Sequence, residues 1–229
     1  MSSIRIRPVG LTHQKTEQER KVRKQTVEKR LETIYQRLKD QHKLSKKTIE
    51  HIAAVYRGVP HHKFSPKHQD CLLCAIIIVG SHQAKEPVTF GEAQIAVGLT
   101  LLSSPRKGDR LARMINKKVR NLYRDLGKKM VPANPLEYVD RFCLKTGLSK
   151  EVAEASKDII GERGADGLMP SGIAVAAISL AADNFGRKLL ITDLGKIFGV
   201  TCVTIRKGKI KLIEENHSSF FVLANFSYF

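Results

Sequence analysis

The sequence repeats itself, and this internal duplication constrains the fold more than any other feature. The tripeptide Leu-Ser-Lys at 44–46 recurs 104 positions later, at 148–150. In each copy a proline, again at an offset of 104, precedes a segment that is apolar almost all round, at 71–79 and at 173–182. A helix without a polar face belongs at the centre of a bundle. The duplication therefore predicts two copies of one helical unit, each built around a buried helix.

The stretch V-P-A-N-P at 131–135 breaks any helix and separates the two copies. We expect an all-α fold of two tandem five-helix repeats, the second ending in a helix-turn-helix. The expected parts are an N-terminal arm at 1–16, a strongly basic first repeat at 17–132, a second repeat at 133–216 and an apolar tail at 217–229. The tail is too short to span a bilayer, and we expect it to pack back on the second repeat or, if exposed, to dock another protein.

The stretch from 192 to 212 has the pattern of two short helices joined by a tight turn. We predict that Thr192 caps the first helix, that Gly199 ends it in a left-handed conformation, and that Thr201 caps the second. Gly208 lies within the second helix, where glycine costs about 1 kcal/mol relative to alanine, so we expect bending or fraying there. In a helix-turn-helix, the first turns of the second helix enter the DNA major groove. The pattern alone is equally typical of an ordinary helix hairpin in an all-α core.

The formal net charge is +18, and its excess lies in one half of the chain. Residues 1–132 hold 28 Lys and Arg against 11 Asp and Glu, whereas residues 133–229 hold 12 against 11. A half-chain this basic indicates a polyanionic partner, with nucleic acid ahead of membrane. We expect a connection at 103–110 and then a basic helix from about Leu111 to Lys129, which together form the best phosphate-contacting patch. A solvated basic face is the usual alternative for such a charge run.

Several other classes of protein are disfavoured. No run of 18 uncharged apolar residues exists and the N-terminus lacks a hydrophobic signal core, so we expect a soluble intracellular protein that acts with the genome and binds no membrane. The sequence has no glycine-rich phosphate loop, nucleophile elbow or recognisable pair of catalytic carboxylates, so we expect a binding protein rather than an enzyme. We expect four reduced cysteines, at 71, 74, 143 and 202.

One group of residues has the composition of a metal site. His61, His62, His68, Cys71 and Cys74 lie close together in sequence, and zinc takes Cys and His ligands. The two cysteines, however, lie inside the apolar central segment, and the chain has no second C-x-x-C pair. Buried small residues beside exposed histidines are the more common reading. We therefore predict no metal and no other cofactor.

Three motifs of the second copy carry a specific resemblance. They are P-L-E-Y-V-D-R-F-C-L-K-T-G-L-S at 135–149, M-P-S-G-I-A-V-A-A-I-S-L-A-A at 169–182 and G-V-T-C-V-T-I-R at 199–206. In this order they resemble the second cyclin-like repeat of transcription factor IIB and its archaeal counterpart, transcription factor B. The first copy resembles the family's first repeat more loosely, best at 115–126.

The resemblance implies a core that clamps TATA-binding protein and double-stranded promoter DNA, with the second repeat reading the B-recognition element. Val203 and Arg206 stand at the family's base-contacting positions, and we expect Thr201 and Thr204, in the same first turns of the second helix, to contact bases as well. Arg206 can pair with guanine O6 and N7, while Val203 or a threonine methyl can pack on a thymine methyl. We expect a monomer whose contacts to the DNA backbone come from Lys207, Lys209, Lys188, Arg106, Lys107, Arg110, Arg113, Lys117, Lys118, Arg120 and Arg124.

The sequence also departs from the family's pattern. The family carries an N-terminal zinc ribbon that docks on RNA polymerase, whereas no cysteine precedes Cys71 here. Either the sequence is a core fragment, or it is a variant that cannot engage polymerase in the family's way and competes with the full-length factor. The rival function is a protein-binding adaptor of the cyclin type, for which DNA is incidental. Steep salt dependence of DNA binding would favour the transcription factor.

Overall fold

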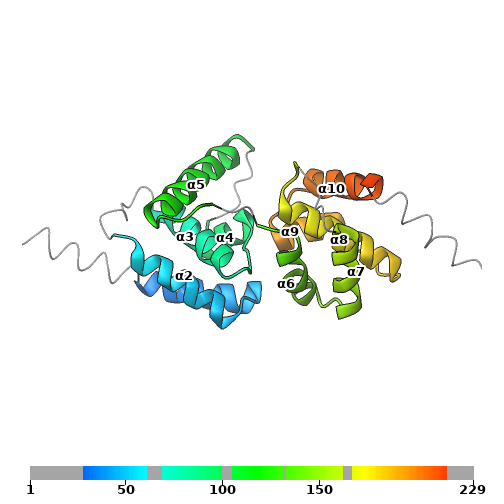
Figure 1. The fold of residues 1–229 in the computed structure, drawn as a ribbon, viewed down its shortest axis with the longest axis horizontal. Coiled ribbons are helices and arrows are strands. Elements are labelled where there is room, and N and C mark those ends of the chain that lie inside the picture. Colours follow the sequence, from blue (N-terminus) through cyan, green and yellow to red (C-terminus); the bar gives the residue numbers. More distant parts are fainter. Residues whose placement is uncertain (1–27, 61–68, 100–104, 131–132, 162–166, 216–229) are drawn as a thin grey trace, which may run out of the picture.

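The computed structural model describes residues 28–60, 69–99, 105–130, 133–161 and 167–215, with side chains left out for 105–109. Within these ranges every regular element is a helix, so the predicted all-α fold class is confirmed. The helices form two bundles that follow one another along the chain (Figure 1). Each bundle has its own continuous hydrophobic core.

The two bundles have the same helix order. The first contains a helix described over 28–42, followed by α2 (Lys46–Gly58), α3 (Gln69–Gln83), α4 (Phe90–Val97) and α5 (Pro105–Asp125). The second contains α6 (Leu136–Thr146), α7 (Lys150–Ile160), α8 (Pro170–Asn184), α9 (Ile191–Phe198) and α10 (Cys202–Glu215). The predicted five-helix unit is therefore present twice.

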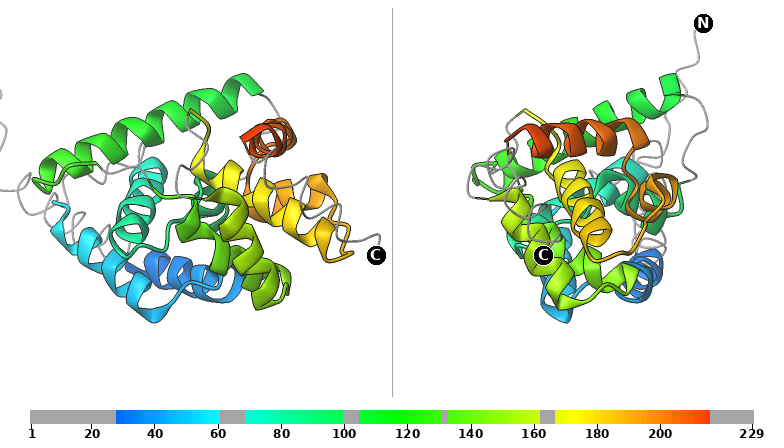
Figure 2. Two further views of the ribbon diagram at one scale, coloured as in Figure 1. Left: turned by 45° about the vertical axis from the view of Figure 1, so that its right-hand side comes forward. Right: turned by 90° about the vertical axis from the view of Figure 1, so that its right-hand side faces the viewer.

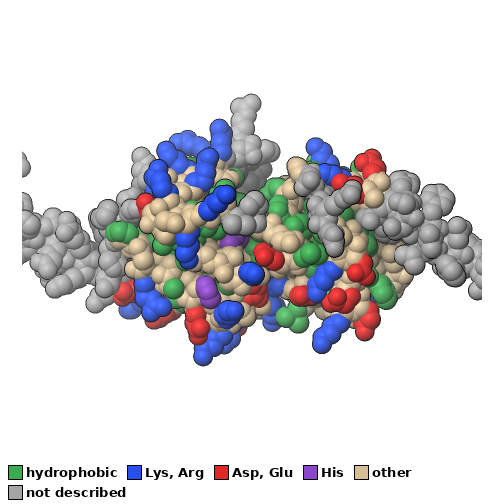
Figure 3. Space-filling model, viewed as in Figure 1, with side chains coloured by type: hydrophobic (Ala, Val, Ile, Leu, Met, Phe, Trp, Pro, Cys, Tyr) green, Lys and Arg blue, Asp and Glu red, His purple; other side chains and the backbone are tan. Residues whose placement is uncertain are grey.

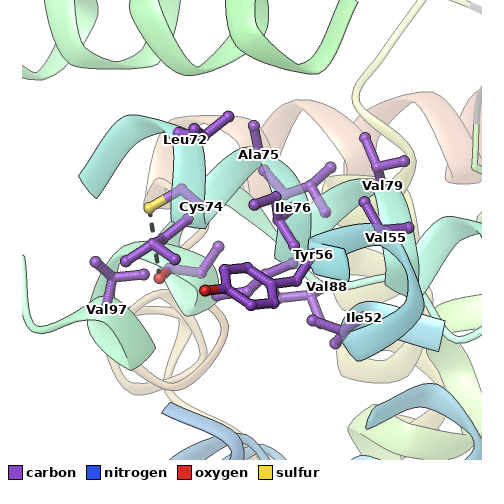
Figure 4. Close-up of a cluster of buried hydrophobic side chains, with 14 of the residues drawn as sticks. Ile52, Val55, Tyr56, Leu72, Cys74, Ala75, Ile76, Val79, Val88 and Val97 are labelled. Carbon is purple, nitrogen blue, oxygen red and sulfur yellow. Dashed lines mark hydrogen bonds between the residues drawn. The ribbon is translucent and has the colours of Figure 1, made fainter. Parts of the chain in front are cut away.

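The apolar segments form the central helices, as predicted. In α3 every residue from 71 to 81 is buried, and in α8 every residue from 171 to 179 is buried. α3 packs against α2, α4 and α5, while α8 packs against α6, α7, α9 and α10. Figure 4 shows the first core, in which the thiol of Cys74 points to the carbonyl of Ala93 at 3.6 Å. A helix surrounded in this way has no face left for polar side chains.

The repeated Leu-Ser-Lys tripeptide marks the same structural position in both bundles. Ser45 is the N-cap of α2, and Ser149 is the N-cap of α7. The Ser45 hydroxyl accepts a hydrogen bond from the backbone N–H of Thr48 (3.3 Å), one of the donors that a helix start leaves without an intrahelical partner. The preceding leucine, Leu44, is buried in the first core.

Three predicted helix boundaries were wrong. The basic helix begins at Pro105, within the segment expected to be a connection, because proline is well tolerated in the first turn of a helix. The same helix ends at Asp125 rather than near Lys129, and the N–H of Lys128 turns back to the carbonyl of Tyr123 (2.9 Å). Thr192 does not cap α9: it lies exposed inside the first turn, and the N-cap is Leu190. α9 begins one residue earlier than Thr192, at Ile191, which packs on the second core.

Some expectations fall outside the described residues. These are the N-terminal arm at 1–16, the start of the first helix at 17–27 and the apolar tail at 217–229. In the part of the chain that the structure describes, no helix has the length and apolar character needed to cross a membrane.

Candidate nucleic-acid interface

α9 and α10 form the predicted helix-turn-helix. Gly199 ends α9 with φ 63°, in the left-handed region, and the N–H of Val200 donates to the carbonyl of Gly195 (3.1 Å). Thr201 then begins α10, because its hydroxyl accepts from the N–H of Thr204 (3.1 Å). The predicted roles of Gly199 and Thr201 in the turn are thus confirmed.

The first turns of α10 present a mixed face to solvent. Thr201, Val203, Arg206 and Lys207 are exposed, and Val203 is 58% exposed although it is apolar. Ile205 is fully buried between them and anchors the helix to the second core. An exposed valine beside an exposed arginine leaves a thymine-methyl contact and a guanine contact available on one helix face.

Thr204 differs from its neighbours. A Cβ placed on Gly172 of α8 would lie 2.5 Å from the Thr204 Cγ2 atom, so the Thr204 methyl packs inward against α8. Its hydroxyl lies 2.8 Å from that of Thr201. The four predicted base-contacting residues therefore differ in their surroundings. Thr201, Val203 and Arg206 are exposed, whereas the methyl group of Thr204 packs between α10 and α8.

The expectation that Gly208 bends or frays α10 was wrong. The helix continues without a break from Cys202 to Glu215, and Gly208 is buried. A Cβ at this position would lie 2.8 Å from the Cβ of Ala176 and 3.3 Å from the carbonyl oxygen of Gly172. Gly208 is the point where α10 approaches the backbone of α8, so tertiary packing outweighs the local helix propensity.

The lysines around α10 differ in their availability. Lys207 is exposed on the same turn as Arg206, and Lys188 is exposed in the connection before α9. Lys209 instead turns back to α8, where its ammonium lies 2.9 Å from the Asp183 carboxylate and 3.1 Å from the Ser179 hydroxyl. A phosphate at Lys209 would have to compete with that ion pair.

α5 presents a stripe of cations. The exposed side chains on one face are Arg110, Arg113, Lys117, Arg120 and Arg124, at alternating spacings of three and four. This set is called the α5 stripe below. At 1.5 Å per residue it extends for about 21 Å. The opposite face, including Ile115, Val119 and Leu122, is buried in the first core. The α5 stripe is therefore a linear positive surface held on a rigid helix.

Three other predicted cations of α5 are not included in the α5 stripe. Lys118 is half-buried on the flank of α5, where it lines a shallow pocket with Leu72 of α3. Arg106 and Lys107 belong to the first turns of α5, but their side chains lie outside the described residues.

α5 and α10 lie on the same side of the molecule. Both run along the upper edge in Figure 1, and both stay at the top in the two views of Figure 2. Figure 3 shows Lys and Arg side chains gathered over α5. α5, which carries the α5 stripe, and α10, which begins with the exposed residues named above, therefore run on one side of the molecule.

The cysteines of the suspected metal group are structural. Cys71 and Cys74 are buried in α3, and burial raises the pKa of both thiols, which disfavours the thiolate that metals require. His61, His62 and His68 lie outside the described residues. Within the described ranges, no group of three or more His, Cys, Asp or Glu side chains is arranged to hold a metal ion.

The two repeats are joined through a buried ion pair. Glu92 of α4 is fully buried, and both of its carboxylate oxygens accept from the guanidinium of Arg141 on α6, each at 2.8 Å. Lys145, one turn further along α6, adds a third contact at 2.9 Å. Burial alone would raise the pKa of the Glu92 carboxyl, but the charge of Arg141, the hydrogen bonds from His42 and Arg141 and the charge of Lys145 together outweigh it and hold the pKa well below its usual range.

Comparison with known proteins agrees with the motifs. No protein-family model matches the chain. Transcription initiation factor IIB of Archaeoglobus fulgidus is 29% identical over 177 residues, which cover 75% of this chain and 51% of that protein. Transcription initiation factor IIB 2 of Thermoplasma acidophilum is 30% identical over 162 residues, covering 69% of this chain and 49% of that protein. The chain belongs to the transcription factor IIB family. It spans about half the length of these two relatives, and 24% of a third, from Methanocaldococcus jannaschii, at 29% identity over 170 residues.

For this transcription factor IIB relative, sequence reasoning did not find the residues that join the repeats. Glu92 and Arg141 are 49 positions apart, and nothing local marks them as partners. A signal did exist for Glu92, because T-F-G-E at 89–92 has the form of a capping box. The structure shows that box closed at the start of α4.

Proposed function

We propose that this chain is the DNA-binding core of a general transcription initiation factor, which binds promoter DNA together with TATA-binding protein. The relatives are transcription initiation factors by name, and this supports a role at the start of transcription. In the proposed complex α10 enters the major groove and reads the B-recognition element, while the first repeat holds the phosphate backbone. The chain acts as an intracellular binding protein rather than an enzyme.

One observation supports the proposal most: α5, whose exposed face carries the α5 stripe, and α10, whose first turns are exposed, run on the same side of the molecule. Phosphate contacts supply affinity and register but carry no sequence information, whereas base-edge contacts supply the choice. Five cations on α5 fit the first task. Val203 and Arg206, with Thr201 beside them, fit the second.

A mobility-shift assay on a TATA-containing duplex tests the proposal directly. We expect the chain to shift the duplex more strongly when TATA-binding protein is present, and to lose affinity steeply as salt rises. Equal binding with and without TATA-binding protein would remove the promoter role. A complex with a protein partner that forms without DNA and survives high salt would favour the cyclin-type adaptor instead.

The base-reading role of α10 needs a separate test. Selection from random duplexes with Arg206→Ala should lose about 1–3 kcal/mol of preference at one base pair. Lys207→Ala is the matched control, since it removes the neighbouring exposed cation and should weaken all sequences alike. If Arg206→Ala selects the same sequences as the wild type, α10 does not read bases through this residue.

The effect on initiation is a further part of the proposal. Adding the chain to a reconstituted transcription system that already contains the full-length factor distinguishes two outcomes. Lower output would identify a competitor for the promoter complex, whereas activity without the full-length factor would show that this core supports initiation by itself.

A further inference from the structure

The junction between the repeats is centred on one carboxylate. The Glu92 side chain is 0% exposed, and Arg141 is 2% exposed. Arg141 also donates to the backbone carbonyls of His42 (3.2 Å) and Pro87 (2.7 Å), both in the first repeat. A two-pronged guanidinium–carboxylate pair is directional, so it holds α6 at one angle to α4 rather than merely nearby.

The same carboxylate organises the start of α4. It accepts from the backbone N–H of Thr89 (3.0 Å), while the Thr89 hydroxyl accepts from the N–H of Glu92 (3.0 Å) and so closes the capping box. The Thr89 hydroxyl has a proton left to donate. It donates that proton to the carbonyl of Phe198 at the end of α9, at 2.7 Å.

The end of α9 is therefore held by the first repeat. The carbonyl of Ile197, next to Phe198, accepts from the ammonium of Lys145 on α6 (2.7 Å). The same ammonium binds Glu92, so it links the end of α9 to the first repeat. The backbones of α4 and of the turn after α9 are also in close contact here: a Cβ built on Gly91 would lie 2.5 Å from the Cα of Gly199. Gly199 is the turn residue between α9 and α10, so the turn that aims α10 rests directly on the first turn of α4.

We infer that Glu92 is a positioning residue, which locks the helix-turn-helix of the second repeat onto the first repeat. The lock sets the distance and angle between the α5 stripe and α10 before any ligand binds. Its consequence for DNA rests on the proposed function: a fixed spacing lets one duplex engage both surfaces at once, so the second contact forms at a high effective concentration.

The lock is tested on the full chain without DNA, by measuring the distance between spin labels on α5 and α10. Asn116→Cys and Glu214→Cys place the labels at exposed positions outside the α5 stripe and the base-contacting residues. Cys202→Ser removes the half-buried native thiol, and the other three cysteines are buried. We expect one narrow distance distribution in this background and a broad one after Glu92→Gln.

Glu86→Gln is the matched control. In the contacts that the structure gives, the Glu86 carboxylate bonds only Ser45 and Thr48 of its own repeat, so this change should leave the distance distribution narrow.

A second variant covers the case in which Glu92→Gln does not fold. Lys145→Met keeps the Glu92–Arg141 pair but removes the contacts to Glu92 and to the Ile197 carbonyl, so it should also broaden the distribution, though less. Helix content by circular dichroism identifies the folded variants. A narrow, unchanged distribution in a folded variant that has lost its junction contacts would overturn the inference, as would a broad distribution before any junction residue is changed.

The DNA measurement separates the lock from the proposed function. With a duplex long enough to reach both repeats, Glu92→Gln should lower the affinity by at least about tenfold through the lost effective concentration, with unchanged base preference at the Arg206 contact. If the distances respond as expected but no variant binds duplex, the lock stands and the proposed function fails. If duplex binds and Glu92→Gln leaves the distances and the affinity unchanged, the lock fails alone.

Discussion

Replacing Gly208 by alanine sets two physical effects against each other. Within a helix, alanine is favoured over glycine by about 1 kcal/mol, because glycine loses more backbone freedom on folding. At this position, however, the new Cβ would lie 2.8 Å from the Cβ of Ala176 and 3.3 Å from the carbonyl oxygen of Gly172. Both are attached directly to the backbone of α8, so neither can move aside by a rotamer change.

The packing term is expected to prevail. Inserting an extra carbon into a well-packed core typically costs about 1–3 kcal/mol. With the gain of about 1 kcal/mol in propensity subtracted, Gly208→Ala should lower the free energy of unfolding by roughly 1 kcal/mol. Helix propensity alone would predict an increase of the same size in the free energy of unfolding. The sign of the measured change therefore shows whether packing or propensity dominates.

Urea denaturation followed by circular dichroism measures the effect. Lys207→Ala is the control on the same helix, since that side chain is exposed and the change should stay within about 0.5 kcal/mol. Adding Ala176→Gly to Gly208→Ala removes the closest clash, so the two changes together should cost less than the sum of the two alone. A Gly208→Ala variant about 1 kcal/mol more stable than the wild type would refute the close approach of α10 to α8.

Two further predictions concern the stability of each core. Phe142→Ala should cost about 3–5 kcal/mol in urea denaturation, because Phe142 is fully buried and stacks on Phe198 at 4.0 Å, whereas Leu144→Ala, at a side chain 65% exposed, should cost under about 0.5 kcal/mol. Burial lowers the pKa of His82 from its usual value of 6.5 to about 4. Between these two pH values the His82 side chain is protonated in the unfolded chain but neutral in the folded chain. Stability should therefore fall as pH drops through that window, by up to about 3 kcal/mol, and His82→Gln should flatten this part of the pH profile; an unchanged profile would contradict a partly buried His82 that stays neutral in the folded chain.

Much of the architecture follows from sequence patterns whose causes are local. Residues 71–79 and 173–182 offer no polar face, so they had to become the central helices wherever the other helices lay. Gly199 and Thr201 were found because a left-handed turn and a side-chain cap each favour few residue types. The exposed α5 stripe follows equally from the spacing of its cations against buried Ile115 and Val119.

Features that depend on a distant partner were not predictable in this way. The local cap preference of Thr192 was overridden by the packing of Ile191 on the second core. The sequence predicts the helix-propensity cost of Gly208. It does not predict the close approach of α10 to α8 that requires a glycine there, because that approach depends on Ala176 in another helix. The pair Glu92–Arg141 is one choice among the 40 Lys and Arg and 22 Asp and Glu residues of the chain. Such pairings emerge only when the helices are placed in space.

The salt dependence of duplex affinity tests the central claim most directly. Each neutralised phosphate contributes about −0.9 to the slope of log affinity against log salt, so Lys117→Ala with Arg120→Ala should reduce the slope by about 1.8 and leave base preference unchanged. The control is Lys46→Ala with Lys47→Ala, which removes the same charge from exposed positions on α2, across the bundle from α5 in Figure 1, and should leave the slope nearly as it was. Equal slopes for the two double variants would contradict the account, because the α5 stripe would then hold no phosphates.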